Sequence, residues 1–172
     1  MRVFVVYYSW TGHTKQVAEV IAEECDADLE QIQDVEDRAD FFFGYLRSAY
    51  HALTKQISGI RAVVKDPADY DLVVLGTPVW AWNLSPPMRA YISAQSAKFR
   101  EVGFFCTEGG AGGDGVFKQM AELSGKRPVA TLIVTEAELK SSDYGDKLQE
   151  FAQALARRST DSDAGSSAQI AS

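Results

Sequence analysis

The stretch from Val5 to Ala18 reads VVYYSWTGHTKQVA, and it predicts how the rest of the chain folds. Its apolar part ends abruptly at a loop, residues 9–14, that holds one glycine and three hydroxyl side chains. A helical pattern follows, because Val17, Ile21 and Cys25 recur every four residues. The stretch therefore predicts a buried strand, a hydroxyl-rich loop and an amphipathic helix, in that order.

A loop of this kind at the start of a helix favours the binding of a phosphate. The first N–H groups of a helix have no acceptor within the helix, and the helix dipole favours an anion at that end. Ser9, Thr11 and Thr14 add neutral donors. A simpler interpretation is that Thr11 or Thr14 only caps the helix. One cap needs one hydroxyl, and three surround this glycine, so we favour phosphate binding.

The composition indicates a single globular domain. The chain has 172 residues, of which 46% are hydrophobic, which suits a sizeable core. The sequence holds no apolar run long enough to span a membrane, and its N-terminal apolar run is too short for a signal peptide. Cys25 and Cys106 lie in apolar patterns without the spacing of a zinc site, so we expect buried thiols in a reducing compartment. These features predict a cytoplasmic protein.

Short apolar runs recur along the chain and predict the strands of a parallel sheet. Four of them are apolar at nearly every position, as expected for strands covered on both faces: Val3–Tyr8, Leu72–Gly76, Val102–Cys106 and Ala130–Val134. The more polar run Ala27–Ile32 predicts an edge strand. Helical patterns alternate with the strands, within residues 17–25, 42–57, 88–92, 116–123 and 148–155. Before the third of these, Ser85 and Pro86 predict an N-cap and a first helical residue.

This alternation predicts a doubly wound α/β fold of three layers. Five parallel strands in the order 2-1-3-4-5 would carry helices on both faces. Ligands bind such sheets beyond the carboxyl ends of the strands, where the strand order reverses, and the loop of residues 9–14 lies at that point. We assign the domain to residues 1–157. Residues 158–172 lose the apolar period and predict a disordered tail or a cloning remnant.

Three loops should meet at the carboxyl ends of the central strands. Besides residues 9–14, these are TPVWAWNLSPP at residues 77–87 and the glycine-rich TEGGAGGDG at residues 107–115. A Walker loop and a dinucleotide GxGxxG motif are both absent, as are the clustered aspartates of a phosphorylated receiver. Tryptophans in the second loop can cover a flat ring, and glycines in the third allow close approach of backbone amides.

The order SxTGxT, GTPVW and a glycine-rich loop resembles the flavodoxin family, which binds FMN. The resemblance runs from about Arg2 to Leu155 and implies a flavodoxin-like three-layer sandwich that carries electrons between redox partners. It implies that residues 9–14 hold the FMN phosphate, that Trp80 stacks on the flavin, and that Thr107 to Gly110 offer amides to its pyrimidine edge. The implied cofactor-binding residues are Ser9, Trp10, Thr11, Gly12, His13, Thr14, Pro78, Val79, Trp80, Ala81, Trp82, Asn83, Thr107, Glu108, Gly109 and Gly110. We predict no catalytic residue and no metal site.

Two positions depart from the family pattern. Many flavodoxins have a glycine after the stacking aromatic, and its peptide turns so that the carbonyl accepts from the reduced flavin. This chain has Ala81 there, and a positive φ costs a residue other than glycine about 1 kcal/mol. The neutral semiquinone is therefore expected to be less favoured. Many flavodoxins also place a tyrosine in the third loop, where this chain has Glu108 and glycines, so that face of the ring is expected to be open.

Three functions follow from these features. The first is electron transfer between redox partners. The alternative is an NAD(P)H-dependent FMN oxidoreductase that reduces quinones or similar acceptors, which the open third loop and Ala81 favour, although no nicotinamide motif supports it. A module that binds no flavin would leave the hydroxyl cluster and Trp80 without a shared purpose.

The charge gives a further indication about partners. The net charge of −7 argues against nucleic acid, which requires a basic face, and fits a soluble protein that docks on a basic partner. Such a partner would be steered by an acidic rim after the second strand, made of Asp34, Glu36, Asp37 and Asp40. Acidic residues before a helix also stabilise its N-terminus without any partner, and both interpretations stay open.

Overall fold

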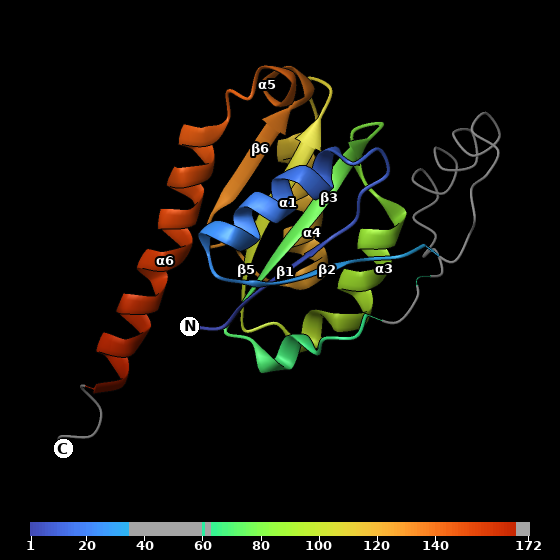
Figure 1. The fold of residues 1–172 in the computed structure, drawn as a ribbon. Helices are drawn as coiled ribbons and strands as arrows, with labels where there is room; N and C mark the ends of the chain where they lie inside the picture. Colours follow the sequence, from blue (N-terminus) through green and yellow to red (C-terminus); the bar gives the residue numbers. More distant parts are fainter. Residues whose placement is uncertain (35–59, 61–62, 168–172) are drawn as a thin grey trace.

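Five parallel strands form the centre of the molecule (Figure 1). The computed structural model of the chain describes residues 1–34, 60 and 63–167. The strands are β1 (Val3–Tyr7), β2 (Asp28–Gln31), β3 (Leu72–Trp80), β5 (Glu101–Glu108) and β6 (Thr131–Thr135). Their order across the sheet is β2-β1-β3-β5-β6, and each neighbouring pair runs parallel. The predicted order 2-1-3-4-5 is therefore confirmed.

One strand was not expected from the sequence. The two-residue strand β4 (Asn83–Leu84) pairs antiparallel with the end of β3, with Val79 opposite Leu84 and Trp80 opposite Asn83. The second predicted loop is therefore largely a β-hairpin. Both β3 and β5 also continue beyond their predicted ends, so that Trp80 and Glu108 are the last residues of their strands.

Helices cover both faces of the sheet. The first face carries α1 (His13–Glu24) and α6 (Gly145–Ser167), and the second carries α3 (Pro86–Gln95) and α4 (Gly113–Ser124). The short helix α5 (Glu136–Ser141) follows β6, and the 3-10 turns η1 (Pro67–Asp69) and η2 (Ser96–Lys98) precede β3 and β5. The predicted helix within residues 42–57 lies outside the described residues. Among the helices that the structure describes, none is long and apolar enough to cross a membrane.

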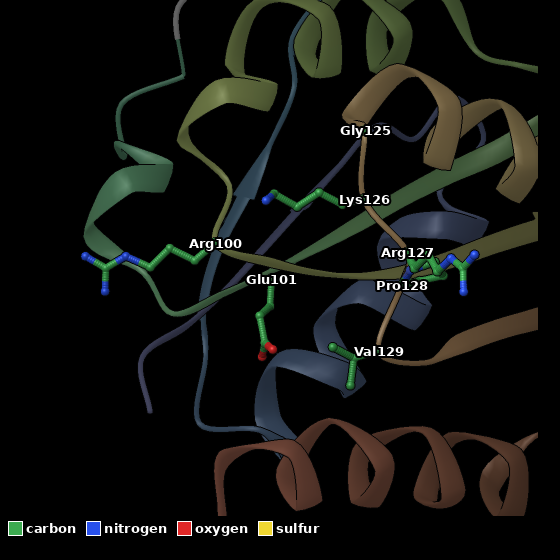
Figure 2. A pocket seen from close by; sticks show the side chains of 7 residues that line it. All are labelled: Arg100, Glu101, Gly125, Lys126, Arg127, Pro128 and Val129. Carbon is green, nitrogen blue, oxygen red and sulfur yellow. The ribbon is translucent and has the colours of Figure 1, made fainter. Parts of the chain in front are cut away.

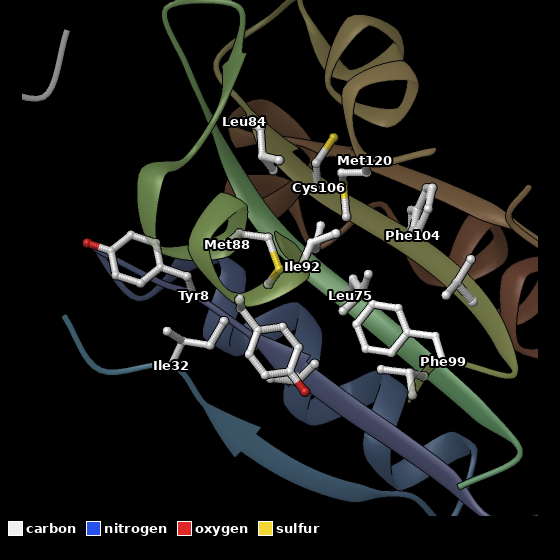
Figure 3. Packing of buried hydrophobic residues seen from close by; sticks show 14 of the residues in the cluster. Tyr8, Ile32, Leu75, Leu84, Met88, Ile92, Phe99, Phe104, Cys106 and Met120 are labelled. Atoms are coloured by element: carbon white, nitrogen blue, oxygen red, sulfur yellow. The ribbon is translucent and has the colours of Figure 1, made fainter. Parts of the chain in front are cut away.

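The side chains of β1 alternate between two cores. Phe4 and Val6 are buried against α3 and α4, whereas Val3 and Val5 are buried against α1 and α6. This alternation explains why the strand is apolar at every position, since each face of the sheet is covered. The core toward α3 and α4 is shown in Figure 3. Each fully buried side chain of this size stabilises the fold by about 1.5–3 kcal/mol.

Some local expectations are confirmed, and others need correction. Ser85 is the N-cap of α3 and Pro86 its first residue, as predicted, but the Ser85 hydroxyl makes no cap hydrogen bond and lies 2.8 Å from the hydroxyl of Thr77. Cys106 is buried as predicted, whereas Cys25 is only half-buried, and burial raises the pKa of both thiols. Helix α6 runs past residue 157 to Ser167, and the domain boundary at residue 157 stays a prediction.

Candidate functional site

The three predicted loops meet at the carboxyl ends of β1, β3 and β5, at one end of the sheet (Figure 1). Each pair of loops is joined by a direct contact. Thr14 joins the first loop to the third, Trp10 joins the first to the second, and Gly112 joins the third to the second. The structure therefore brings together the segments that the sequence assigned to a single site.

Ser9 shapes the first loop. Its hydroxyl oxygen accepts hydrogen bonds from the N–H groups of Gly12 and Lys15, each at 3.2 Å. Gly12 precedes the first residue of α1 with φ 94°, in the left-handed region that glycine adopts without strain. Of the three hydroxyls, Ser9 is therefore the one that caps the helix, whereas the simpler interpretation gave this role to Thr11 or Thr14.

The start of α1 keeps open donors. Among the described residues, the N–H groups of Thr11, His13 and Thr14 reach no acceptor. Thr11 is exposed, so its hydroxyl stands beside these amides at the surface. Lys15 pairs with Glu19 at 3.7 Å, one turn further along the helix. The loop can therefore hold an anion through neutral donors and the helix dipole.

Thr14 is held differently from the other two hydroxyl residues. Its side chain is 1% exposed, and its oxygen lies 2.8 Å from the hydroxyl oxygen of Thr107 at the end of β5. Either hydroxyl can donate in this pair. Thr14 therefore links the start of α1 to the third loop.

An aromatic cluster stands beside this loop. The ring of Trp80 meets Tyr8 edge-on at a centroid distance of 5.7 Å and Trp10 edge-on at 6.0 Å. Trp10 is 41% exposed and Trp82 is 70% exposed, which is unusual for side chains of this size. Edge-to-face packing orients Trp80 and leaves the cluster open to solvent, so it can cover a planar ligand.

The turn after Trp80 is strained. Ala81 and Trp82 have φ values of 47° and 61°, a left-handed conformation that costs residues other than glycine roughly 1 kcal/mol each. The structure thus gives Ala81 a positive φ, the conformation that costs free energy at this position because the residue is not glycine. Gly112 approaches this turn closely, since a Cβ atom added to it would lie 2.9 Å from Val79 Cγ1 and 3.2 Å from Trp82 Cα. The turn and the third loop are therefore packed together.

The third loop presents backbone rather than side chains. Glu108 is buried, and its Oε2 atom accepts the N–H of Gly113 at 2.7 Å, so this carboxylate caps α4. Gly109 and Gly110 are exposed, and a Cβ atom added to either would meet nothing within 4 Å. This part of the loop is therefore open to solvent, and the prediction of an open face on the flavin ring stays a prediction.

Some predicted residues lie elsewhere, and some functional candidates were missed. Asp34 forms an isolated bridge with Ile60, while Glu36, Asp37 and Asp40 of the acidic rim lie outside the described residues. No group of His, Cys, Asp and Glu side chains within the described part of the chain could hold a metal ion. The sequence analysis missed three residues that contact the site: Tyr8, Arg89 and Gln119. Tyr8 adjoins the first loop and could have been found, but the helical pair carries no sequence signal.

A cavity of about 380 Å³ lies at the opposite end of the sheet (Figure 2). It is lined by Arg100, Glu101, Gly125, Lys126, Arg127, Pro128 and Val129, at the amino ends of β5 and β6. Because the three loops lie at the carboxyl ends, this cavity is separate from the candidate site.

Several solved structures share the fold. A flavoprotein from Lactobacillus acidophilus, described as a complex with FMN, gives a TM-score of 0.69 at 23% identity and covers 81% of this chain and 97% of its own. A two-electron reduced flavodoxin from Megasphaera elsdenii gives a TM-score of 0.60 at 20% identity and covers 90% of this chain and 98% of its own. At these identities the likeness concerns the fold.

Sequence comparison agrees with this likeness. A curated NAD(P)H dehydrogenase (quinone) from Cupriavidus metallidurans is 33% identical over 91 residues, which are 53% of this chain. The match spans 45% of that relative, so this chain corresponds to less than half of it. The family model described as flavodoxin matches residues 2–150. That match includes all three loops, and the chain belongs to the flavodoxin family.

Proposed function

We propose that this protein binds FMN across the three loops and carries electrons between redox partner proteins. One observation carries the proposal, namely that N–H groups at the start of α1, which reach no acceptor among the described residues, lie beside an open tryptophan cluster. The first feature suits a phosphate and the second suits a flat ring. FMN joins a phosphate to a flat ring, so the residues present fit this cofactor.

In this proposal the phosphate lies at the first loop. The amides of Trp10 to Thr14 and the hydroxyls of Ser9, Thr11 and Thr14 would hold it, as the resemblance to flavodoxins implies. Ser9 and Thr14 also shape the loop through the bonds described above. Because Lys15 pairs with Glu19, binding in this proposal relies on hydrogen bonds and the helix dipole rather than on an ion pair with this lysine.

The ring lies between the second and third loops in the same proposal. Trp80 would stack on it, Pro78 to Asn83 would line one side, and the backbone of Thr107 to Gly110 would meet its polar edge. FMN supplies the redox chemistry when bound, and the protein supplies position, hydrogen bonds and charge. The acidic composition, with a net charge of −7, supports docking on a basic partner.

A second candidate function is the reduction of quinones or similar acceptors by NAD(P)H through bound FMN. Two observations favour it. The curated relative is named an NAD(P)H dehydrogenase (quinone), and the exposed backbone at Gly109 and Gly110 leaves room for a second planar molecule.

One set of measurements separates the two functions. The apoprotein is titrated with FMN and with riboflavin, which lacks the phosphate, and fluorescence quenching gives both affinities. Stepwise photoreduction then shows whether electrons enter one at a time, as expected for a carrier, or as a pair. Fast NAD(P)H oxidation that requires a quinone would instead favour the enzyme. If micromolar protein does not quench FMN fluorescence, both flavin-based functions are wrong.

The phosphate assignment has its own test. Because Thr11 is exposed and its hydroxyl has no partner among the described residues, Thr11→Ala should leave the melting temperature unchanged. It should weaken FMN binding about fivefold, the effect of losing one hydrogen bond, and leave riboflavin binding unchanged. Equal loss for both ligands would contradict the assignment.

A further inference from the structure

Arg89 is a buried arginine next to the site. It lies in α3 and is 6% exposed, and no carboxylate in the described part of the chain pairs with it. Burial lowers the pKa of its guanidinium. Its Nη2 atom donates to Oε1 of Gln119 in α4 at 2.7 Å. Burying a charge without an opposite charge beside it costs free energy, so the hydrogen bonds of the Arg89 guanidinium are needed to offset that cost.

A chain of hydrogen bonds continues from Gln119 to the strained turn. Gln119 Nε2 donates to Oδ1 of Asn83 at 3.3 Å, and Asn83 Nδ2 donates to the carbonyl oxygen of Ala81 at 2.8 Å. Gln119 Oε1 also accepts the N–H of Leu84 at 3.4 Å. These hydrogen bonds thus connect α3, α4 and β4 to the turn between Trp80 and Asn83.

The direction of these hydrogen bonds is set by the donors at Gln119 Oε1, of which Arg89 makes the shorter bond. A guanidinium only donates, so Gln119 must point its oxygen toward Arg89 and its NH₂ group toward Asn83. Asn83 then accepts through its oxygen and presents its NH₂ group to the Ala81 carbonyl. No other arrangement of the two amides satisfies all these bonds, so the two groups that donate to Gln119 Oε1, the Arg89 guanidinium and the Leu84 N–H, determine which group reaches the turn.

The Ala81–Trp82 turn is strained, so a hydrogen bond that holds it can decide its conformation. Two-residue β-hairpin turns in which both central residues have positive φ usually contain glycine or asparagine, and this turn contains Ala81 and Trp82. The Ala81 carbonyl is the group that would rotate if the turn relaxed, because it belongs to the peptide between the two strained residues. Asn83 holds that carbonyl.

We propose that Arg89, Gln119 and Asn83 form a positioning relay that fixes the Ala81 carbonyl and keeps the Ala81–Trp82 turn in one conformation. The consequence for FMN rests on the proposed function. A flavin ring gains an N–H donor when it is reduced, and a carbonyl directed toward Asn83 is less available to accept from it. The relay therefore makes the first electron harder to add than it would be if the Ala81 carbonyl were released from Asn83.

The variant Gln119→Glu separates this role from a merely structural one. A carboxylate at position 119 still accepts from Arg89 and from the Leu84 N–H, and adds an ion pair, so thermal stability should be kept. It cannot donate to Asn83, and it attracts the Asn83 NH₂ group away from the Ala81 carbonyl. The matched control is Gln153→Glu at an exposed position of α6, where Gln153 Oε1 also accepts from an arginine, Arg157, at 3.5 Å.

The first readout needs no cofactor. In NMR spectra of the apoprotein, Gln119→Glu should move the backbone N–H signal of Trp82, which shares its peptide with the Ala81 carbonyl. It should also shift the signals of the Asn83 side-chain amide, because that group changes its acceptor from the Ala81 carbonyl to the new carboxylate. Gln153→Glu should change neither. Unchanged signals in Gln119→Glu would overturn the relay, whether or not the protein binds FMN.

The second readout uses the FMN-loaded protein. Asn83→Ala removes the last donor without adding charge, and Gln119→Glu should shift the first reduction step in the same direction. We expect the first electron to be added up to about tenfold more favourably, which is about 59 mV for a one-electron couple. Shifts of opposite sign in the two variants would indicate a charge effect and overturn the relay. Failure of the wild type to bind FMN would instead contradict the proposed function.

Discussion

The hydroxyl oxygens of Thr14 and Thr107 lie 2.8 Å apart, between the first turn of α1 and the end of β5. Both side chains are buried, so this pair is shielded from water. A hydroxyl has one proton, and phosphate oxygens at neutral pH mainly accept. If Thr14 donates to the FMN phosphate, Thr107 must therefore donate to Thr14.

This order of donors predicts a ligand-specific effect of Thr107→Val. Valine keeps the shape but cannot donate, so the Thr14 hydroxyl loses the partner that directs its proton outward. FMN affinity should fall about fivefold, while riboflavin affinity stays the same, as measured by fluorescence quenching. Thr131→Val, an exposed position on β6, is the matched control and should change neither affinity. A parallel loss for riboflavin would show that Thr107 acts on the ring side.

Much of the fold could be predicted because elements such as β1 and α1 have a strong local pattern of apolar residues. Val3 to Tyr7 are buried on both faces, and α1 buries Val17 and Ile21, so the apolar periods were easy to recognise. The edge strand β6 was harder to predict. Its apolar sequence predicts a strand covered on both faces, but Thr131 is exposed and Ile133 is half-buried. Edge position depends on which strands lie beside it, and a local pattern does not contain that information.

The contacts that shape the site could not be predicted for a similar reason. Thr14 and Thr107 are 93 positions apart, and Arg89 meets Gln119 only because α3 packs on α4. The hairpin was missed because its turn has Ala81 and Trp82 where such turns normally have glycine or asparagine. Here the packing of Gly112 and the bond from Asn83 outweigh the local preference.

Trp80 should matter at the ring end of the site. Trp80→Leu removes the flat surface and the edge contacts with Tyr8 and Trp10, and should weaken FMN and riboflavin by the same factor, about tenfold. Trp80→Phe keeps an aromatic face and should restore most of the affinity for both ligands. Titration of both ligands checks this, and a loss limited to FMN would contradict a ring contact.

Gly76 should be needed for the packing of β3 on β5. A Cβ atom added there would lie 1.9 Å from Phe105 Cζ, inside the buried sheet. Gly76→Ala should therefore destabilise the protein by about 3 kcal/mol, because the ring must move within a packed core. Urea denaturation followed by circular dichroism gives this value.

The control for that substitution is Gly115→Ala. Gly115 lies in α4 with nothing within 4 Å of an added Cβ atom, so alanine should stabilise the helix by about 0.5–1 kcal/mol. Equal effects of the two substitutions would contradict the packing argument.

Glu138 should make the stability of the fold depend on acid pH. It caps α5 by accepting from the N–H of Thr135 at 2.8 Å and from its hydroxyl at 2.9 Å, and it pairs with Lys147. The bond from Lys147, then the bond from the Thr135 backbone, lowers the pKa of Glu138 to about 2, from 4.5. Because the folded-state pKa is the lower one, the carboxylate stabilises the fold above pH 4.5, and this contribution is lost as the pH falls toward 2.

Glu138→Gln should therefore be less stable than the wild type at pH 7 and gradually equal to it in acid. We expect a difference of about 0.5–1 kcal/mol at neutral pH, since the ion pair is partly exposed and solvent screens it. Urea denaturation at several pH values between 7 and 3 measures the difference. Glu136→Gln removes the same charge from the same turn without breaking the cap, so its difference should stay small throughout. A difference for Glu138→Gln that persists unchanged at pH 3 would assign the effect to packing rather than to charge.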